Sequence, residues 1–348
     1  MKQNWTYKKL GELGKISSGK SISSDCITEN FTEGLYPCYG GNGLRGYVNT
    51  FLYDGFYPII GRVGALCGNV HLTKGKFYPT EHALVMVTNG CNIPEYIVYA
   101  LKSMNLNQYA KGVAQPVLSA STLSKLPIPL PPLSTQSRIV SELDLLQSII
   151  DKQKAQLKEL DNLAQVLFYD MFGDPVENEK GWERIPFESS IQKVKYTTKL
   201  QSKDYLDSGK YPIISQEEEY ISGYWNNDED LFRVVSPVVI FGDHTRILKY
   251  VDFSFVLGAD GVKIFLPISA VTPWYLYYFL KSSNIPSLGY SRHYKLLKEL
   301  TVPIPPLDLQ QSFTAKIESI EKHKAAITKS IEETQKLFDY TMDKYFGE

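Results

Sequence analysis

The sequence predicts an α+β protein made of two similar mixed α/β domains, each followed by one long helix. The two helices are predicted to pair as an antiparallel coiled coil, so that the chain carries a pseudo-twofold internal repeat. Three observations carry this prediction: an apolar heptad pattern at 134–172, the same pattern again near the end of the chain, and matching segments in the globular regions. A chain of 348 residues is long enough for two domains with ordinary cores.

The first long helix is predicted from apolar residues spaced alternately four and three positions apart. This spacing places one apolar stripe along a helix, and the stripe must be buried against another helix. No Gly or Pro interrupts residues 134–172, and at ~1.5 Å per residue the helix is about 55–60 Å long. The predicted seam residues are Ile139, Leu143, Leu146, Ile150, Leu157, Leu160 and Leu167.

The second long helix repeats this register near the end of the chain. Its predicted seam residues are Phe313, Ile317, Ile320, Ile327, Ile331 and Phe338. Gln153 and Lys324 interrupt the two seams, and such polar intrusions fix the register more often than they add stability. Proline-rich segments precede both helices and stop them from extending backwards, so Ser134 and Asp308 are predicted as the N-caps.

The globular regions repeat as well, in the same order along the chain. The matching segments include Pro94–Ser103 and Pro273–Ser282, which are predicted as short helices because proline stands at or near their first position. Short apolar runs at residues 57–60, 83–87, 234–241 and 262–265 are predicted as strands. The predicted parts are a first domain at 1–130, a central helix at 131–173, a second domain at 174–304 and a C-terminal helix at 305–348. Within them, residues 174–181 form a polar hinge.

Composition places the chain among ordinary globular proteins, with 43% hydrophobic and 22% charged residues. No apolar run approaches the length that a membrane-spanning helix needs, which is roughly 20 residues, so we expect no membrane span. The N-terminal segment lacks the apolar core of a signal peptide. The four cysteines show no paired spacing, which indicates reduced thiols and a cytoplasmic protein.

Two short motifs are weak evidence for other functions. Residues Gly14–Ser21 match the phosphate-binding pattern GxxxxGK[ST]. The segment before them is too polar for a central strand, and the segment after them is a poor helix former. The second motif is the set Cys67, His71, His82 and Cys91, whose spacing is wrong for a closed zinc site. We therefore expect neither a nucleotide nor a metal.

Two similar domains on paired helices suggest a way to read duplex DNA. Such an object can place two readers on two half-sites a fixed distance apart, and one turn of duplex is ~34 Å. Residues 36–80 and 211–254 share little beyond anchor positions, as expected of one scaffold that carries two different reading surfaces. The same facts also fit an adaptor that does not bind DNA and presents two interaction domains at a fixed spacing.

Several segments resemble one known family. Residues 126–140, with the sequence LPIPLPPLSTQSRIV, and their repeat at 300–314 resemble the conserved regions of type I restriction–modification specificity subunits. The opening at 5–21, the tetrapeptide Asp-Met-Phe-Gly at 170–173, and FGDHTR at 241–246 followed by residues 257–264 resemble further parts of that family. The matching segments extend over the whole chain and follow one another in the same order as in the family. A specificity subunit of another restriction system that uses the same domains remains an alternative.

The resemblance implies two target-recognition domains, each reading one half of a split double-stranded DNA site. It also implies that the helix pair sets the spacer and docks adenine methyltransferase subunits, two per chain, with restriction and translocation subunits joining for cleavage. S-adenosylmethionine, ATP and magnesium would belong to those partners, and this subunit would hold no cofactor. The sequence agrees with a non-catalytic subunit, since it has no Asp/Asn-Pro-Pro-Tyr/Phe tetrad and no usefully spaced nuclease motif.

Candidate DNA contacts are polar and basic residues in the divergent loops, since base edges and phosphates are bound by Arg, Lys, Asn, Gln and small polar groups. The loops 112–115 and 289–292 match each other just before the proline-rich segments. The candidates are Asn42, Arg45, Arg62, Lys111 and Gln115 in the first half, and Gln216, His244, Arg246, Arg292, His293 and Lys295 in the second.

The net charge of −1 is low for a protein that binds DNA by itself, because phosphate neutralisation supplies much of the affinity. Two explanations reconcile this low net charge with DNA binding. Either basic domain faces are offset by acidic helices and an acidic hinge, or partner subunits supply much of the grip on DNA. We therefore expect the isolated chain to bind DNA weakly and its methyltransferase complex to bind strongly.

Overall fold

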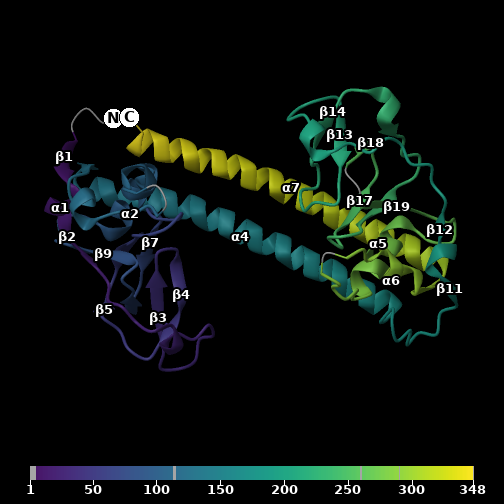
Figure 1. Ribbon diagram of the computed structural model, residues 1–348, viewed down its shortest axis with the longest axis horizontal. Helices are drawn as coiled ribbons and strands as arrows, with labels where there is room; N and C mark the ends of the chain where they lie inside the picture. The colour runs from purple at the N-terminus through teal and green to yellow at the C-terminus, as the bar shows by residue number, and fades with distance from the viewer. Residues whose placement is uncertain (1–4, 113–114, 259–260, 290, 348) are drawn as a thin grey trace. The chain divides into compact units, whose positions relative to one another are not determined.

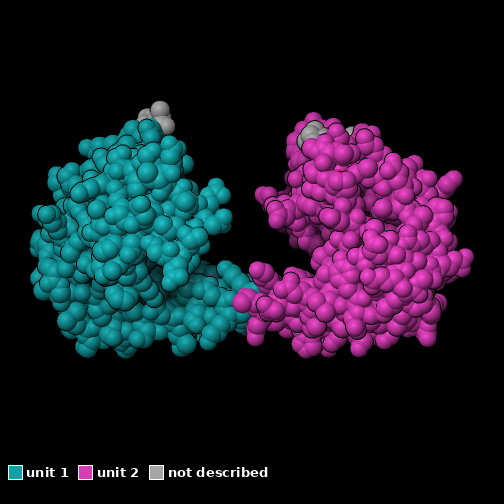
Figure 2. All heavy atoms as spheres, turned by 90° about the horizontal axis from the view of Figure 1, so that it is seen from below, with its two compact units in different colours: residues 1–154, 329–348 teal, residues 155–328 magenta. Residues whose placement is uncertain are grey.

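The computed structural model describes residues 5–112, 115–258, 261–289 and 291–347. The chain divides into two compact units, shown in two colours in Figure 2: residues 1–154 with 329–348 form unit 1, and residues 155–328 form unit 2. Both long helices, α4 (Leu133–Phe172) and α7 (Leu307–Phe346), contribute a stretch to each unit. Each unit therefore contains one globular domain and a section of the helix pair (Figure 1).

The described residues in the globular part of unit 1 form three small sheets. One has the strand order β2-β9-β6-β7, with bounds β2 Gly14–Ser18, β6 Tyr57–Gly61, β7 Val70–Thr73 and β9 Ala83–Thr88. The next has the order β4-β3-β8-β5, with bounds β3 Tyr36–Gly40, β4 Gly43–Val48, β5 Tyr53–Asp54 and β8 Lys76–Pro79. The third pairs β1 (Thr6–Lys9) with β10 (Pro127–Leu130). The helical segments are α1 Leu10–Leu13, η1 Ser24–Cys26, α2 Pro94–Ser103, η2 Leu106–Tyr109 and α3 Ala120–Leu123.

Unit 2 repeats this topology strand for strand. Its sheets have the orders β12-β19-β16-β17, β14-β13-β18-β15 and β11-β20. The bounds are β11 Arg184–Pro186, β12 Ile191–Gln192, β13 Tyr211–Ile214, β14 Gly223–Trp225, β15 Leu231–Phe232, β16 Val238–Gly242, β17 Leu248–Val251, β18 Phe255–Leu257, β19 Val262–Pro267 and β20 Thr301–Pro303. The helical segments are η3 Phe187–Ser189, η4 Ser202–Asp204, η5 Asp228–Asp230, α5 Pro273–Ser282 and α6 Tyr294–Lys298. Even the parallel pairing of β3 with β8 has its counterpart in β13 with β18, which confirms the predicted repeat.

The helix pair is antiparallel, as predicted. In unit 1 the Tyr345 hydroxyl donates to Glu142 (2.7 Å), and further along the pair the Gln153 amide donates to Ser330 (2.7 Å). From the first contact to the second, the residue number rises on α4 and falls on α7, so the two helices run in opposite directions. Every predicted seam residue is buried or half-buried.

The polar residue in each seam finds a partner on the other helix. Gln153 donates to Ser330 in unit 1, and in unit 2 the Lys324 ammonium lies 2.8 Å from the Asp161 carboxylate. Polar pairs inside an apolar seam penalise shifted registers, because a shift leaves them unpartnered. The two phenylalanines Phe168 and Phe172, which the seam prediction left out, are also buried in the core of unit 2.

The predicted N-caps of the long helices are wrong by a small shift. The helices begin at Leu133 and Leu307, so Ser134 and Asp308 lie inside the first turn instead of capping it. The reason is that helical hydrogen bonding already begins at Pro132 and Pro306, the last prolines of the proline-rich segments before the two helices. The Pro132 carbonyl accepts from the backbone N–H of Gln136, and the Pro306 carbonyl accepts from the backbone N–H of Gln310 in the same way.

The segment predicted as a hinge, residues 174–181, is folded onto the end of α4. The Lys180 ammonium donates to the carbonyls of Asp170 (2.6 Å) and Met171 (3.0 Å), and the Trp182 indole donates to the Phe172 carbonyl (3.1 Å). These groups satisfy carbonyls that a helix leaves without partners at its C-terminus. The segment therefore acts as a helix cap as well as a connection.

A buried glutamine fastens the first domain to the start of its long helix. Gln136 is fully buried, its side-chain oxygen accepts from the Ile93 N–H (3.0 Å), and its amide donates to the Pro131 carbonyl (2.9 Å). Ile93 is the N-cap of α2 and offers no capping side chain. Gln136 thus satisfies an amide at the start of α2 and ties that helix to α4. The Tyr96 hydroxyl adds a bond to the Pro129 carbonyl (2.6 Å).

The second domain uses the same fastening. Gln310 is fully buried, accepts from the Thr272 N–H (2.8 Å) at the start of α5, and donates to the Pro305 carbonyl (2.9 Å). The Tyr275 hydroxyl donates to the Pro303 carbonyl (2.7 Å). Gln136 and Gln310 occupy equivalent positions in the two copies of the helix repeat.

Replacing either buried glutamine by alanine should destabilise the protein by about 1–3 kcal/mol, because a buried N–H then loses its acceptor. The matched controls are Gln147→Ala and Gln335→Ala, which remove a half-buried and an exposed glutamine from the same helices and should change stability by no more than about 0.5 kcal/mol. Urea unfolding at a constant m-value measures the difference. Equal effects at the buried and control positions would contradict the fastening role.

Candidate nucleic-acid interface

Three of the five candidates in unit 1 line a single open pocket of about 450 Å³. Asn42 and Arg45 reach it from the β3–β4 hairpin, and Gln115 reaches it from the loop that follows η2. The remaining lining residues are mostly small, namely Gly40, Gly41, Val63, Gly64, Ala65, Leu66 and His82. Glycine and alanine in the lining leave room for a ligand to approach the backbone closely.

Local hydrogen bonds orient two of these polar side chains. The Asn42 side-chain oxygen accepts from the Asn69 amide (3.0 Å), and the Arg45 guanidinium donates to the Ser24 hydroxyl (3.1 Å). Asn42, Arg45 and Gln115 are all exposed. Oriented amide and guanidinium groups on an accessible surface have the chemistry that recognises base edges.

The other two candidates of unit 1 are not part of this pocket. Arg62 is half-buried at the end of β6, and its guanidinium donates to the Glu81 carbonyl (3.2 Å). Lys111 exchanges backbone hydrogen bonds with Val117, and its side chain is exposed. The structure gives Arg62 a fold-stabilising contact and leaves Lys111 accessible. Residues 113 and 114 of the predicted loop lie outside the described residues.

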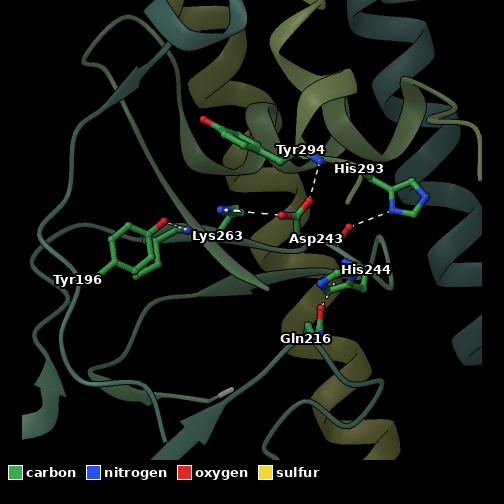
Figure 3. Close-up of polar contacts among 8 residues, drawn as sticks. Tyr196, Gln216, Asp243, His244, Lys263, His293 and Tyr294 are labelled. Carbon is green, nitrogen blue, oxygen red and sulfur yellow. Dashed lines mark hydrogen bonds and ion pairs between the residues drawn. The ribbon is translucent and has the colours of Figure 1, made fainter. Parts of the chain in front are cut away.

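In unit 2, the candidates Gln216 and His244 meet at the turn between β16 and β17 (Figure 3). The side-chain oxygen of Gln216 lies 3.3 Å from the backbone N–H of His244, and the Gln216 carbonyl accepts from the Thr245 hydroxyl (2.6 Å). Gln216 follows β13 and His244 follows β16, which belong to two different sheets, and the packing of these sheets brings the two residues together. Both side chains are half-buried.

Asp243 is the centre of this region, although the sequence did not single it out (Figure 3). The residue is 2% exposed; one carboxylate oxygen accepts from the Tyr294 N–H (2.7 Å), and the other lies 3.8 Å from the Lys263 ammonium. Lys263 in turn lies 5.1 Å from the centre of the Tyr294 ring. A buried carboxylate with one amide and one cation as partners holds the turn, β19 and α6 together. The sequence offered one signal for Asp243, its place directly before the candidate residue His244.

His293 is not a DNA contact in this structure, and the prediction that included it is corrected. The side chain is fully buried, Nδ1 donates to the Asp243 carbonyl (2.9 Å), and Nε2 accepts from the Leu288 N–H (2.9 Å). Both ring nitrogens are used inside the fold, so none can reach a base. Its neighbours Arg292 and Lys295 are exposed and stay candidates.

Arg246 occupies a backbone position that favours glycine. The hairpins β6–β7 and β16–β17 close in the same way: Gly68 donates to the Gly61 carbonyl (2.8 Å), and Arg246 donates to the Gly242 carbonyl (2.7 Å). Gly68 has φ +92° and Arg246 has φ +62°, and this left-handed conformation costs a residue other than glycine about 1–2 kcal/mol. The Arg246 guanidinium is exposed at the surface and donates to the Ile285 carbonyl (2.8 Å), which orients it.

Charge is distributed unequally between the two halves. Residues 1–132 hold 12 basic and 7 acidic residues, whereas residues 173–306 hold 15 basic and 17 acidic residues. The two long helices are mildly acidic, with 4 basic and 6 acidic residues in α4 and 6 basic and 7 acidic residues in α7. The first domain is therefore basic with a net charge of +5, and the second, at −2, is not.

The structure also bears on the other sequence motifs. Residues 14–18 form strand β2, paired with β9, and only the short 3-10 segment η1 follows Lys20, so the phosphate-binding motif does not form a P-loop. Among the described residues, no group of three or more His, Cys, Asp or Glu side chains is arranged to hold a metal ion. No helix in the described part of the chain is long and apolar enough to span a membrane.

Buried Lys249 supports the loop that carries Gln216. It lies on β17, is 3% exposed, and its ammonium donates to the carbonyls of Ser215 (3.0 Å) and Glu219. Burial lowers the pKa of Lys249 to about 8, and the negative charges of Glu219 and Glu217 oppose this shift. The loop conformation thus depends on a lysine that titrates far below its usual range.

The fold defines a class of protein: a duplicated head domain, in two diverged copies, attached to an antiparallel helix pair, with polar pockets on the heads. A family model for the type I restriction modification DNA specificity domain matches this chain twice, at residues 2–162 and 179–336. The chain belongs to this family. Specificity subunits are the non-catalytic recognition proteins of type I systems, so the family confirms the prediction of a non-catalytic subunit.

Individual relatives agree with this placement. The specificity subunit of the type I restriction enzyme EcoprrI of Escherichia coli is 46% identical over 144 residues, which span 41% of this chain and only 36% of that protein. A putative type I restriction enzyme specificity subunit of Haemophilus influenzae, S.HindORF215P, is 23% identical and covers 96% of this chain and 93% of its own.

Two solved structures share the fold. The type I restriction–modification S subunit from M. genitalium has a TM-score of 0.65 at 18% identity, covering 99% of this chain and 96% of that chain. A chain from a study of complex assembly and conformational transition of the type I R-M system has a TM-score of 0.53 at 15% identity, covering 99% and 98%. At 18% and 15% identity, the similarity to these two structures shows a shared fold and nothing further.

The titration of Lys249 predicts a pH dependence of stability. Between pH 8 and 10 the unfolded chain keeps this proton while the folded chain releases it, so the free energy of unfolding rises with pH. Compared with Lys249→Met, the wild type should gain roughly 1–2 kcal/mol between pH 7.5 and 9.5, since one pKa unit is worth about 1.4 kcal/mol. Urea titrations of both proteins at several pH values measure this difference, and parallel curves would contradict it.

Proposed function

We propose that this chain is the DNA sequence-specificity subunit of a type I restriction–modification complex in the cytoplasm. Its recognition domains, residues 1–130 and 174–304, each read one half of a bipartite site in double-stranded DNA. The helix pair sets the spacer and docks two adenine methyltransferase subunits, and restriction and translocation subunits join them. S-adenosylmethionine, ATP and magnesium bind to those partner subunits, and this subunit holds no cofactor of its own.

One observation carries the proposal: two domains share the same strand order in every sheet, yet their polar surface groups differ. The first domain offers Asn42, Arg45 and Gln115 around a glycine-rich pocket, and the second arranges Gln216 and His244 around buried Asp243. A common scaffold with different recognition groups suits a split DNA sequence whose halves are unrelated. An adaptor with two equal binding domains would have no need of this divergence.

The charge difference assigns unequal tasks to the domains. The first domain, at +5, attracts phosphates by itself, whereas the second, at −2, depends more on basic surfaces of its partners. This supports the explanation in which methyltransferase subunits supply part of the grip on DNA. The basic charge of the first domain is offset by the acidic helices. In the first half of the chain, charge segregation therefore also accounts for the low net charge.

The function is tested by sequencing the methylated bases of the host genome with and without this gene. We expect deletion to abolish adenine methylation at one bipartite motif with a fixed spacer. The variants Arg45→Ala and Gln216→Ala, expressed in the deletion strain, should relax the motif in different halves, since each base contact is worth about 1–3 kcal/mol of discrimination. Unchanged methylation on deletion, in a host that makes active methyltransferase, would instead support the adaptor.

The isolated chain should bind DNA weakly, and its complex with the methyltransferase should bind the bipartite site strongly. Affinity of the complex should fall steeply with salt, with a slope near −0.9 per phosphate contact in a plot of log K against log salt. Fluorescence anisotropy with a labelled duplex, between about 50 and 200 mM salt, measures both species. Tight, sequence-specific binding by the chain alone would contradict this expectation.

A further inference from the structure

An exposed leucine lies in the open pocket of unit 1. Leu66 is 48% exposed and lines the same pocket of about 450 Å³ as the candidate DNA contacts Asn42 and Arg45. Val63 and Ala65, from the same loop between β6 and β7, line this pocket too. The pocket therefore combines apolar side chains from one loop with polar side chains that have the chemistry of base recognition.

The backbone on both sides of Leu66 is fixed by hydrogen bonds. The Asn107 side-chain amide donates to the carbonyls of Ala65 (3.3 Å) and Cys67 (3.2 Å), the two chain neighbours of Leu66. The Cys67 N–H also donates to the Gly64 carbonyl (3.0 Å), and Cys67 itself is buried. Because the loop is held in this way, the exposure of Leu66 belongs to the fold. An apolar side chain held in water gains free energy when a ligand covers it.

The corresponding loop of unit 2 is shorter and polar. Between the two residues that close each hairpin turn, unit 1 has residues 62–67, whereas unit 2 has only residues 243–245, with the sequence Asp-His-Thr. In unit 2 the side chain of Gln216 lies against this turn, with its oxygen 3.3 Å from the His244 N–H. The second head therefore presents an amide where the first head presents a leucine.

A glycine keeps the pocket of unit 1 open. Gly41 occupies in unit 1 the position that Gln216 occupies in unit 2. The residues three positions earlier, Cys38 and Ile213, both pair with a glycine on the following strand. A Cβ atom at Gly41 would lie 3.2 Å from the Val63 carbonyl oxygen, which is closer than an ordinary contact. The absence of a side chain at this position leaves the apolar loop accessible.

The chemistry of DNA indicates what such a surface can bind. Among the groups that base pairs present in the major groove, the 5-methyl group of thymine is the apolar one. Phosphates offer only polar oxygens, which would leave a leucine uncovered. Single exposed leucines are common and need no ligand. Leu66 differs because it shares its pocket with an arginine, an asparagine and a glutamine, on a domain with a net charge of +5.

We propose that Leu66 contacts the 5-methyl group of a thymine in the half-site read by the first domain, with Val63 and Ala65 beside it. The inference rests on the proposed function and adds to it a specificity-determining residue and the base that this residue recognises. The second domain makes no such contact, because its loop is polar and Gln216 lies against it. Removing the thymine methyl should weaken binding roughly three- to fivefold, the effect of exposing one buried methyl group.

The test uses the full chain in complex with the methyltransferase subunit of its own system, and duplexes that carry its bipartite motif. Each thymine of the motif is replaced in turn by deoxyuridine, which removes the methyl group and keeps the base pair. In fluorescence anisotropy, one replacement should lower the affinity of the wild-type complex roughly three- to fivefold. The Leu66→Ala complex should bind the thymine duplex more weakly by a similar factor, and should bind thymine and deoxyuridine equally at that position.

Two further variants serve as controls. Leu66→Met keeps an apolar side chain and should retain the difference between thymine and deoxyuridine. Leu44→Ala is the matched control, since Leu44 is 52% exposed on β4 of the same head and lies outside the pocket. It should retain the full difference. Both leucines are exposed, so all three variants should keep the thermal unfolding midpoint of the wild type.

Other outcomes would overturn the inference. A Leu66→Ala complex that still distinguishes thymine from deoxyuridine as the wild type does would exclude the methyl contact. A wild-type complex that tolerates deoxyuridine at every thymine would exclude it as well, and weaker binding by Leu66→Ala would then assign Leu66 to insertion between base pairs. Loss of methyltransferase from the Leu66→Ala complex, counted by native mass spectrometry, with an unchanged methyl effect would assign Leu66 to a protein interface. A wild-type complex that does not bind its motif specifically would overturn the proposed function itself.

Discussion

The organisation of this protein depends on how each head is attached to its helix. A fully buried glutamine in each copy accepts a hydrogen bond from the start of the head helix and donates one to the proline-rich lead-in of the long helix. Because both groups of the amide are used and no water can replace them, the direction of the long helix is fixed relative to the head. This fastening adds to the apolar core that each head shares with its long helix, and together they hold the head in a defined orientation.

The same scaffold tolerates very different surfaces because its hydrogen bonds are mostly made by backbone. The hairpin that closes with glycine in unit 1 closes with Arg246 in unit 2, and the backbone bond is unchanged. Retaining arginine in a strained conformation suggests that its side chain contributes more than the strain costs. Where the copies agree in polar chemistry as well, as at Lys102 and Lys281, the lysine stands in the last turn of a helix, where a cation is favourable.

The sequence predicted the repeat and the helix pair because heptad spacing and proline signals are local and periodic. It could not predict that Gln216 and His244 meet, since the packing of two separate sheets joins residues that follow strands in different sheets. His293 was misassigned because a histidine in a polar loop gives no sign of burial, and the carboxylate of nearby Asp243 was overlooked for the same reason. The helix starts were missed by two positions because the proline carbonyls begin the first turn.

The claim that the helix pair sets the distance between two half-sites can be tested by lengthening both helices together. One heptad inserted after Lys154 and one after Thr328 preserve the apolar seam and extend each helix by about 10 Å. The methylated motif should keep both half-sites while its spacer grows by about three base pairs, at ~3.4 Å per pair. Loss of the fixed spacer, or a spacer of unchanged length in a methylating complex, would contradict the account.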